Sequence, residues 1–189
     1  MTDFTLHTVE TAPEGSRPSL EESQAAFGFV PGLHATMAES PQLLAGYKAL
    51  HEAFTNTSFN ADELTVVWQT INVEHACHYC VPGHTGIAHS MKVDGAITDA
   101  LRNETPLPTP RLEALRTFTL AMLRQRGNVS DEQVETFLAA GYTRQNVFEV
   151  ILGLAQKVMS NYTNHIAKTP VDAVFSKFTW QKADAVAAE

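Results

Sequence analysis

The segment from Asn60 to His84 reads NADELTVVWQTINVEHACHYCVPGH. Its first part predicts an amphipathic helix, because Asn60 and Glu63 have the spacing of a capping box. The apolar residues that follow recur at helical spacing, and they are Leu64, Val67, Trp68 and Ile71. This helix leads directly into Cys77 and Cys80, the only two cysteines in the chain.

Similar helix signals recur on both sides of this segment. Capping residues predict helix starts at Ser40, Thr109, Ser130 and Thr143. The proline-rich stretch 103–110 predicts a linker, because proline disrupts a helix interior. The last predicted helix carries apolar residues on one side, namely Val147, Val150, Ile151, Leu154, Val158 and Tyr162. Since we find no alternating strand pattern, no Gly-rich phosphate loop and no internal repeat, we predict an all-α fold.

Length and charge restrict the organisation and the partners. A chain of 189 residues can bury the core of one compact unit. We predict an N-terminal arm over 1–30, a helical domain over 31–180 and a C-terminal tail over 181–189. With 13 Lys and Arg against 21 Asp and Glu, the formal charge is −8. This charge repels phosphate backbones and anionic headgroups, so we expect neither nucleic acid nor a membrane surface as a partner.

The opening of the chain favours a cytoplasmic location. It lacks the basic start and apolar run of a secretory signal, and no later segment holds eighteen uninterrupted apolar residues. In a reducing compartment, a close cysteine pair is more often redox-active or metal-bound than a permanent disulfide. The broad apolar faces of the predicted helices also favour self-association into a homo-oligomer.

The cysteine pair has the arrangement of a redox centre. Pro82 is tolerated only in a first helical turn, so a new helix is expected to start near 77–79. Its N-terminus would stabilise a thiolate. His84 lies one turn past Cys80, where we expect its ring to hydrogen-bond the sulfur and relay a proton. Cys80 is therefore expected to attack an oxidant, and Cys77 to close a disulfide.

Two other interpretations of the cluster stay open. The thiols could simply pack at a helix junction, or they could bind zinc together with His84. In the zinc interpretation the fourth ligand would be His75, His78, Glu74 or His89. A structural zinc site usually draws its ligands from two separated pairs, and none is present here. We therefore expect neither a metal nor a cofactor, and the zinc-binding or redox-sensing module remains the alternative.

The residues from Glu74 to Cys80, followed by His84, resemble the signature of the AhpD-like alkylhydroperoxidases of the carboxymuconolactone decarboxylase family. Other matching features, in the same order along the chain, are Phe29-Val30-Pro31, Ser40-Pro41 and Asn161-Tyr162-Thr163-Asn164-His165. The resemblance implies an all-helical AhpD-like bundle that assembles into oligomers. Members that act as lactone decarboxylases generally lack the cysteine pair, so its presence here favours the peroxidase branch. A lyase activity is a further alternative.

By this resemblance the chain would be a peroxidase that reduces hydroperoxides with electrons from a thiol or dithiol donor. The second cysteine, Cys80, would attack, Cys77 would resolve, and His84 would work in a proton relay. The best-known members add a glutamate twelve residues before the first cysteine, but this chain has Thr65 there. Glu63 and Glu74 are the acidic candidates for that role, and we carry Glu74 as the fourth catalytic residue.

Overall fold

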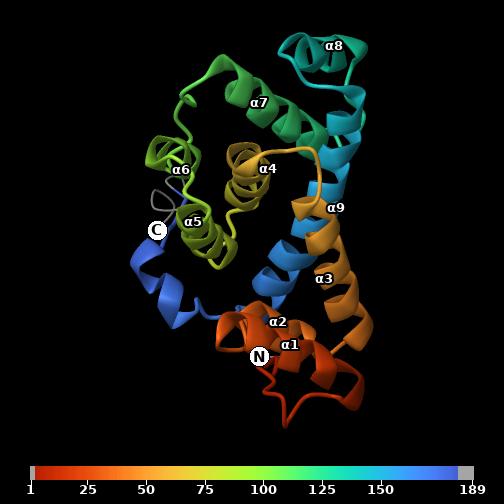
Figure 1. The fold of residues 1–189 in the computed structure, drawn as a ribbon, viewed down its shortest axis with the longest axis vertical. Helices are drawn as coiled ribbons and strands as arrows, with labels where there is room; N and C mark the ends of the chain where they lie inside the picture. Colours follow the sequence, from red (N-terminus) through yellow and green to blue (C-terminus); the bar gives the residue numbers. More distant parts are fainter. Residues whose placement is uncertain (1–2, 183–189) are drawn as a thin grey trace.

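The computed structural model describes residues 3–182, and every regular element within this range is helical (Figure 1). The α-helices are α1 (Arg17–Phe27), α2 (Gly32–Met37), α3 (Pro41–Thr55), α4 (Ala61–Glu74), α5 (Cys80–Ser90), α6 (Gly95–Arg102), α7 (Pro110–Arg124), α8 (Asp131–Ala139) and α9 (Arg144–Ala167). Two short 3₁₀ segments, η1 (Glu14–Ser16) and η2 (Ala173–Phe178), lie near the two ends. The predicted all-α fold is confirmed.

The predicted caps begin five of these helices. In the capping box before α4, the Asn60 side chain accepts from the Glu63 N–H at 3.0 Å, and the Glu63 carboxylate accepts from the Asn60 N–H at 3.0 Å. Equivalent side-chain bonds precede α3, α7, α8 and α9 at Ser40, Thr109, Ser130 and Thr143. These bonds satisfy backbone N–H groups that have no partner inside the helix.

Helix α4 is the centre of the bundle and packs against α5, α6, α7 and α9 (Figure 1). The long helix α9 also lies alongside α3. Gly153 makes this close approach possible, because a Cβ atom there would stand 2.8 Å from both Phe54 on α3 and Val67 on α4. The site described below is built between α4, α5 and α9.

The apolar core has two parts. The first apolar cluster surrounds α4 and includes Trp68 and Leu115. The second joins α1, α2 and α3 to both cysteines. Leu20 on α1 is fully buried in this second cluster. The predicted arm thus contains a packed helix. The predicted division at 30/31 and 180/181 stays a prediction, and residues 183–189 of the predicted tail lie outside the described range.

Helix α9 buries its polar side. The residues that it turns inward include Gln156, Lys157, Ser160, Asn161 and Asn164. Its outward side carries large apolar residues, namely Phe148, Ile151, Tyr162 and Ile166. Apolar residues of a helix ordinarily face the core, so α9 is reversed along this part of its length. The reversal places amide and ammonium groups beside the thiols.

None of the helices within residues 3–182 combines the length and the apolar character that crossing a bilayer requires.

Candidate active site

The turn that presents the thiols begins at the end of α4. The Cys77 N–H donates to the Asn72 carbonyl at 2.9 Å, and the Ala76 N–H donates to the Val73 carbonyl at 2.9 Å. These two bonds form a Schellman motif, which requires a left-handed residue between them. Ala76 takes that conformation with φ of 51°. The chain therefore reverses sharply at Ala76 and directs Cys77 back toward α4.

Helix α5 begins at Cys80, slightly later than expected from Pro82, which lies in its first turn. The backbone N–H of Cys80 donates to the Cys77 sulfur at 3.3 Å. Both cysteines are reduced and in contact through this turn. Cys80 thus occupies the first position of an 11-residue helix, where the helix dipole favours an anion.

The two residues between the cysteines fix the turn to the rest of the protein. His78 Nε2 donates to the Thr169 carbonyl at 2.9 Å. The Tyr79 hydroxyl donates to Asp172 Oδ2 at 2.5 Å and accepts from the Leu33 N–H at 3.0 Å. Tyr79 therefore orients the turn, because it ties the cysteine segment both to α2 and to the chain beyond α9.

The Cys80 sulfur lies among hydrogen-bond donors. Asn164 Nδ2 donates to it at 3.2 Å, and the Cys77 thiol and the Asn161 amide lie beside it. Burial alone raises the pKa of Cys80. However, the Cys77 thiol, the positive charge of Lys157 and the two asparagine amides together outweigh burial and lower this pKa to about 6. Cys80 is therefore a thiolate near neutral pH.

Cys77 behaves in the opposite way. Its hydrogen bond to Cys80 and its burial raise the pKa of the Cys77 thiol well above the ordinary value. Because the thiolate is the nucleophile, the two sulfurs are distinguished before any substrate arrives. Cys80 is ready to attack, whereas Cys77 holds its proton.

Lys157 provides the positive charge beside this pair. Its side chain is fully buried, and Nζ donates to His84 Nε2 at 2.8 Å. The hydrogen bond expected between His84 and the Cys80 sulfur is not among the contacts of residues 3–182, where His84 Nε2 is bonded to Lys157 and Nδ1 has no partner. The His84 ring packs instead on Trp68, with 4.8 Å between the ring centroids. His84 therefore belongs to the site through its hydrogen bond to Lys157.

Amide side chains connect α4 to α9 behind the thiols. Gln69 Nε2 donates to the Val81 carbonyl and to Thr85. Asn72 Nδ2 donates to Gln69 Oε1 at 3.0 Å, and Asn72 Oδ1 accepts from Asn161 at 3.0 Å. This buried network fixes the two helices that carry the partners of Cys80.

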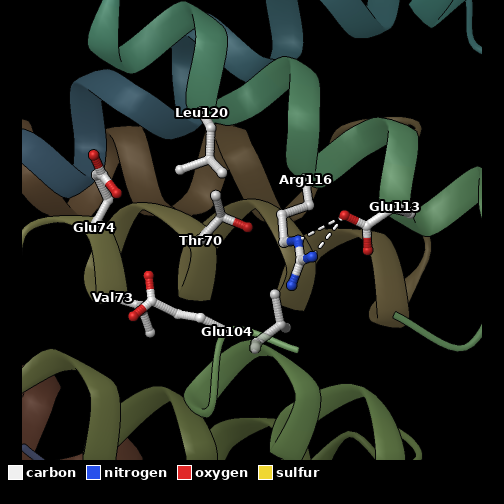
Figure 2. Close-up of a pocket in the computed structure, with 8 residues that line it drawn as sticks. Thr70, Val73, Glu74, Glu104, Glu113, Arg116 and Leu120 are labelled. Atoms are coloured by element: carbon white, nitrogen blue, oxygen red, sulfur yellow. Dashed lines mark hydrogen bonds and ion pairs between the residues drawn. The ribbon is translucent and has the colours of Figure 1, made fainter. Parts of the chain in front are cut away.

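Glu74 makes its contacts elsewhere. Its carboxylate accepts two hydrogen bonds from Arg124, at 2.6 and 2.8 Å. These bonds are the main reason why the pKa of Glu74 is lowered. Glu74 lines a separate pocket of about 180 Å³ between α4, α6 and α7, together with Thr70, Val73, Leu101, Glu104, Glu113, Arg116 and Leu120 (Figure 2). The other charged side chains of this pocket are also paired: Glu113 with Arg116, and Glu104 with Lys182.

The other two positions considered for the relay are also engaged. Glu63 completes the capping box and pairs with Arg111 at 2.8 Å. The Thr65 hydroxyl donates to the Ala61 carbonyl within α4 at 2.9 Å. No hydrogen bond joins Glu63, Thr65 or Glu74 to either sulfur within residues 3–182. The structure therefore brings together Cys77, Cys80 and His84 but not Glu74.

The arrangement of possible metal ligands does not favour zinc. Over residues 3–182, no three His, Cys, Asp or Glu side chains are grouped so that they could hold a metal ion. His75 and His78, two of the suggested fourth ligands, are hydrogen-bonded to Asn161 and Thr169. His89 packs against the Phe178 ring.

Comparison with solved structures reveals the fold to which this geometry belongs. A protein from Ralstonia eutropha JMP134, described as an alkylhydroperoxidase AhpD core and an uncharacterized peroxidase-related protein, superposes with a TM-score of 0.81. The alignment has 20% identity and covers 91% of this chain and 93% of that one. The chain has the AhpD core fold.

Two further structures share the AhpD core fold. An uncharacterized peroxidase-related protein from Silicibacter sp. TM1040 superposes with a TM-score of 0.75 at 16% identity, covering 92% of this chain and 95% of that one. The debrominase Bmp8 superposes with a TM-score of 0.73 at 20% identity, covering 94% of this chain and 96% of that one. No family model and no curated protein sequence matches the chain.

The sequence interpretation missed the contribution of α9 to this site. Lys157, Asn161 and Asn164 follow Gly153 at intervals of 4, 8 and 11 residues, which is helical spacing. A stripe of polar and small residues along a long helix was therefore visible in the sequence. Polar stripes usually face solvent, so the pattern alone does not distinguish a buried reaction centre from an exposed surface.

Proposed function

We propose that the protein is a thiol-dependent peroxidase that reduces hydroperoxides through a Cys77–Cys80 dithiol and disulfide cycle. The observation that carries the proposal is the asymmetry of the pair. Cys80 accepts hydrogen bonds beside a buried cation, whereas Cys77 remains a protonated thiol in contact with it. This is the division of roles that attack and resolution require.

In the first step the Cys80 thiolate attacks the outer oxygen of the hydroperoxide. An S–O bond forms, the O–O bond breaks, and the alkoxide leaves as an alcohol after taking up a proton. The Cys77 thiol then attacks the Cys80 sulfenic acid, so that water leaves and a disulfide remains. An external thiol or dithiol returns two electrons and two protons to restore the starting state.

Access restricts the substrate. Cys77 is 0% and Cys80 is 3% exposed, and residues of α1, α2 and α3 cover them. A hydroperoxide must either be small or enter when these helices move. We therefore expect hydrogen peroxide and short alkyl hydroperoxides to react faster than bulky ones. The likeness to peroxidase-related proteins supports the reaction class.

The test combines turnover with mass analysis. With dithiothreitol as donor, the wild-type protein should consume hydroperoxide, and limiting hydroperoxide should produce a Cys77–Cys80 disulfide. Cys80→Ser should abolish turnover. Cys77→Ser should still react once and stop as a Cys80 sulfenic acid that dimedone traps. Full turnover by Cys80→Ser would refute the proposal.

Reductive dehalogenation is a second candidate. It is favoured by the likeness to Bmp8, which has been crystallised as a cysteine-to-alanine variant with 2,3,4-tribromopyrrole. A thiolate that attacks oxygen can also attack a polarised bromine: an S–Br bond forms, the C–Br bond breaks, and the pyrrole carbon takes up a proton. The Cys77 thiol would then attack the Cys80 sulfur, so that bromide and a proton leave and a disulfide remains. Bromide release from 2,3,4-tribromopyrrole in the presence of dithiothreitol, with no hydroperoxide turnover, would select this function.

A further inference from the structure

Among residues 3–182, Lys157 is the one charged side chain that is fully buried beside the thiols. Within the same range, the single hydrogen bond of its ammonium group is to His84 Nε2 at 2.8 Å. Throughout residues 3–182, no carboxylate lies within ion-pair distance of its ammonium group. An ammonium group without an anionic partner is strongly disfavoured in a protein interior, so the charge on Lys157 depends on the state of its neighbours.

Cys80 is the anion that can balance this charge. Lys157 faces Cys80 and His84 on α5 and Cys77 in the turn before this helix. Burial lowers the pKa of Lys157, whereas the Cys80 and Cys77 sulfurs favour its charged form. Burial lowers the pKa of His84 well below its ordinary value, and burial also lowers the pKa of His51 on α3 to about 4. Both rings are therefore neutral at pH 7.

The remaining titratable groups on the packed helices do not supply a negative charge. On α3, burial chiefly raises the pKa of Tyr47, which stays protonated. On α2, His34 is hydrogen-bonded to Ser23, and its pKa is lowered to about 4, chiefly by burial. On α4 and α7, the carboxylates of Glu63, Glu74 and Glu113 are paired with Arg111, Arg124 and Arg116.

We infer that Lys157 is a proton carrier coupled to the redox state of Cys80: it is charged while Cys80 is a thiolate and neutral once Cys80 is a sulfenic acid or a disulfide. The inference rests on the thiol cycle proposed above. It goes beyond that proposal because it identifies where the proton for the departing oxygen comes from. Oxidation removes the negative charge on Cys80, and the buried ammonium then loses its only counter-ion.

The step balances in atoms and charge. The Cys80 thiolate, the Lys157 ammonium and a hydroperoxide give the Cys80 sulfenic acid, the neutral Lys157 amine and an alcohol. The sulfenic acid and the Cys77 thiol then give the disulfide and water. On reduction, the donor dithiol supplies two electrons and two protons, of which one goes to Cys77 and the other to Lys157.

A redox equilibrium with dithiothreitol measures how many protons the protein releases on oxidation, and it needs no hydroperoxide. If Lys157 loses its proton on oxidation, the exchange with dithiothreitol takes up no net proton. The equilibrium constant should then stay within about twofold between about pH 6.5 and 8.0, where dithiothreitol remains largely protonated. If Lys157 keeps its proton, oxidation of the protein should become about tenfold less favourable for each pH unit.

The same samples report whether Cys80 is a thiolate, through the absorbance at 240 nm that disappears on alkylation. Thiolate absorbance with a flat equilibrium constant supports the inference. Thiolate absorbance with the tenfold slope overturns it, as does the absence of a thiolate over this pH range. Absence of peroxidase turnover alone would refute the proposed function, whereas the inference about Lys157 would still be decided by the redox equilibrium.

A matched variant supplies the opposite behaviour. Lys157→Arg retains its charge in both redox states, because guanidinium does not lose its proton in proteins. Once circular dichroism confirms that this variant is folded, it should show the tenfold slope per pH unit that the wild type lacks. A flat profile in Lys157→Arg would show that residue 157 does not set the number of protons released, and it would overturn the inference.

Discussion

Ala76 adopts a backbone conformation that glycine ordinarily supplies at the end of a helix. Its φ of 51° lies in the left-handed region, which costs an L-residue about 1–2 kcal/mol. Glycine avoids this cost but loses more entropy on folding. We therefore expect Ala76→Gly to raise the free energy of unfolding by about 0.5–1 kcal/mol.

Urea denaturation of Ala76→Gly checks this expectation, with Ala121→Gly within α7 as the control. Ala121 lies inside a right-handed helix, so its replacement should destabilise by about 1 kcal/mol. Equal destabilisation by both variants would contradict the account of the Ala76 turn.

The pKa of Cys80 predicts the pH dependence of its reactivity. Because the Cys77 thiol, Lys157 and the asparagine amides lower this pKa to about 6, iodoacetamide should alkylate Cys80 with a midpoint near that pH. Asn164→Ala removes the amide that donates to the sulfur at 3.2 Å and should move the midpoint upward. An unchanged midpoint in Asn164→Ala would mean that this hydrogen bond does not stabilise the thiolate.

The lowered pKa of Cys80 also contributes to the stability of the folded protein. The unfolded chain holds the Cys80 proton up to its ordinary pKa of about 8.5, whereas the folded protein holds it only below about 6. The contribution of the thiolate to stability is therefore complete above about pH 8.5 and is lost as the pH falls through about 6.

At the scale of single residues, the sequence identified the site residues that are close to one another along the chain. Cys77, Cys80 and His84 lie within eight positions of one another, so their spacing on one helix start was informative. Lys157 and Asn164 lie about eighty positions further on, and only the packing of α9 against α5 brings them to the sulfur. The role assigned to Glu74 rested on proximity in sequence, and its partner Arg124 comes from α7.

At the scale of elements, the contact between α3 and α9 depends on Gly153. A Cβ atom there would stand 2.8 Å from Phe54 and Val67. Gly153→Ala should therefore overpack this interface and destabilise the protein by about 1–3 kcal/mol. Thermal or urea denaturation measures the change.

Gly46, on α3, is the matched control. A Cβ atom at Gly46 would meet Met159 at 3.6 Å, which is ordinary van der Waals contact. Gly46→Ala should therefore stabilise by about 0.5–1 kcal/mol, because alanine favours a helix interior. If Gly153→Ala were as stable as Gly46→Ala, the helices would not be held as close as described.

Helix α1 supplies part of the cover over the thiols. Leu20→Ala should destabilise by about 3 kcal/mol and should accelerate the reaction of the thiols with Ellman's reagent, since Leu20 packs in the same apolar cluster as both cysteines. Leu115→Ala in the other cluster should cost similar stability without the same acceleration. Equal acceleration by both variants would indicate general unfolding rather than local opening.

Capping chemistry explains which elements were predictable. Side-chain caps with apolar stripes placed the starts of α3, α4, α7, α8 and α9. Helix α6 has only 8 residues, and α1 buries only Leu20 and Ser23. Neither carries a long apolar stripe, so neither was recognised. Their position is set by tertiary contacts with the rest of the bundle.

At the scale of the whole molecule, the outward stripe of α9 is the surface through which we expect the predicted self-association. Phe148 is 70% and Ile166 is 66% exposed. They lie five helical turns apart, so this face extends over about 27 Å. Such a contiguous apolar surface is typical of an interface. We expect the protein to self-associate through it.

Sedimentation velocity checks this expectation. Phe148→Glu combined with Ile166→Glu should weaken association by about 2 kcal/mol or more, because each buried charge would lose its hydration. Val174→Glu changes an apolar residue on η2 that is 55% exposed and should leave the assembly unchanged. A wild-type monomer at all concentrations would contradict the expectation.

The fold as a whole was predictable from one short motif, because the segment around Cys77 and Cys80 is specific enough to imply the bundle that surrounds it. The orientation of α9 was not. Hydrophobic periodicity grouped Val147, Ile151 and Tyr162 on one side, and Ile151 and Tyr162 are exposed. A pattern of apolar residues identifies a helix but not which neighbour covers it.

The reversed burial of α9 has a practical consequence for protein engineering. A redesign procedure that favours apolar side chains in the interior would rotate this helix by about 180° or replace Lys157, Asn161 and Asn164 with aliphatic residues. The resulting protein could gain thermal robustness, and it would lose the groups that prepare its sulfur for attack.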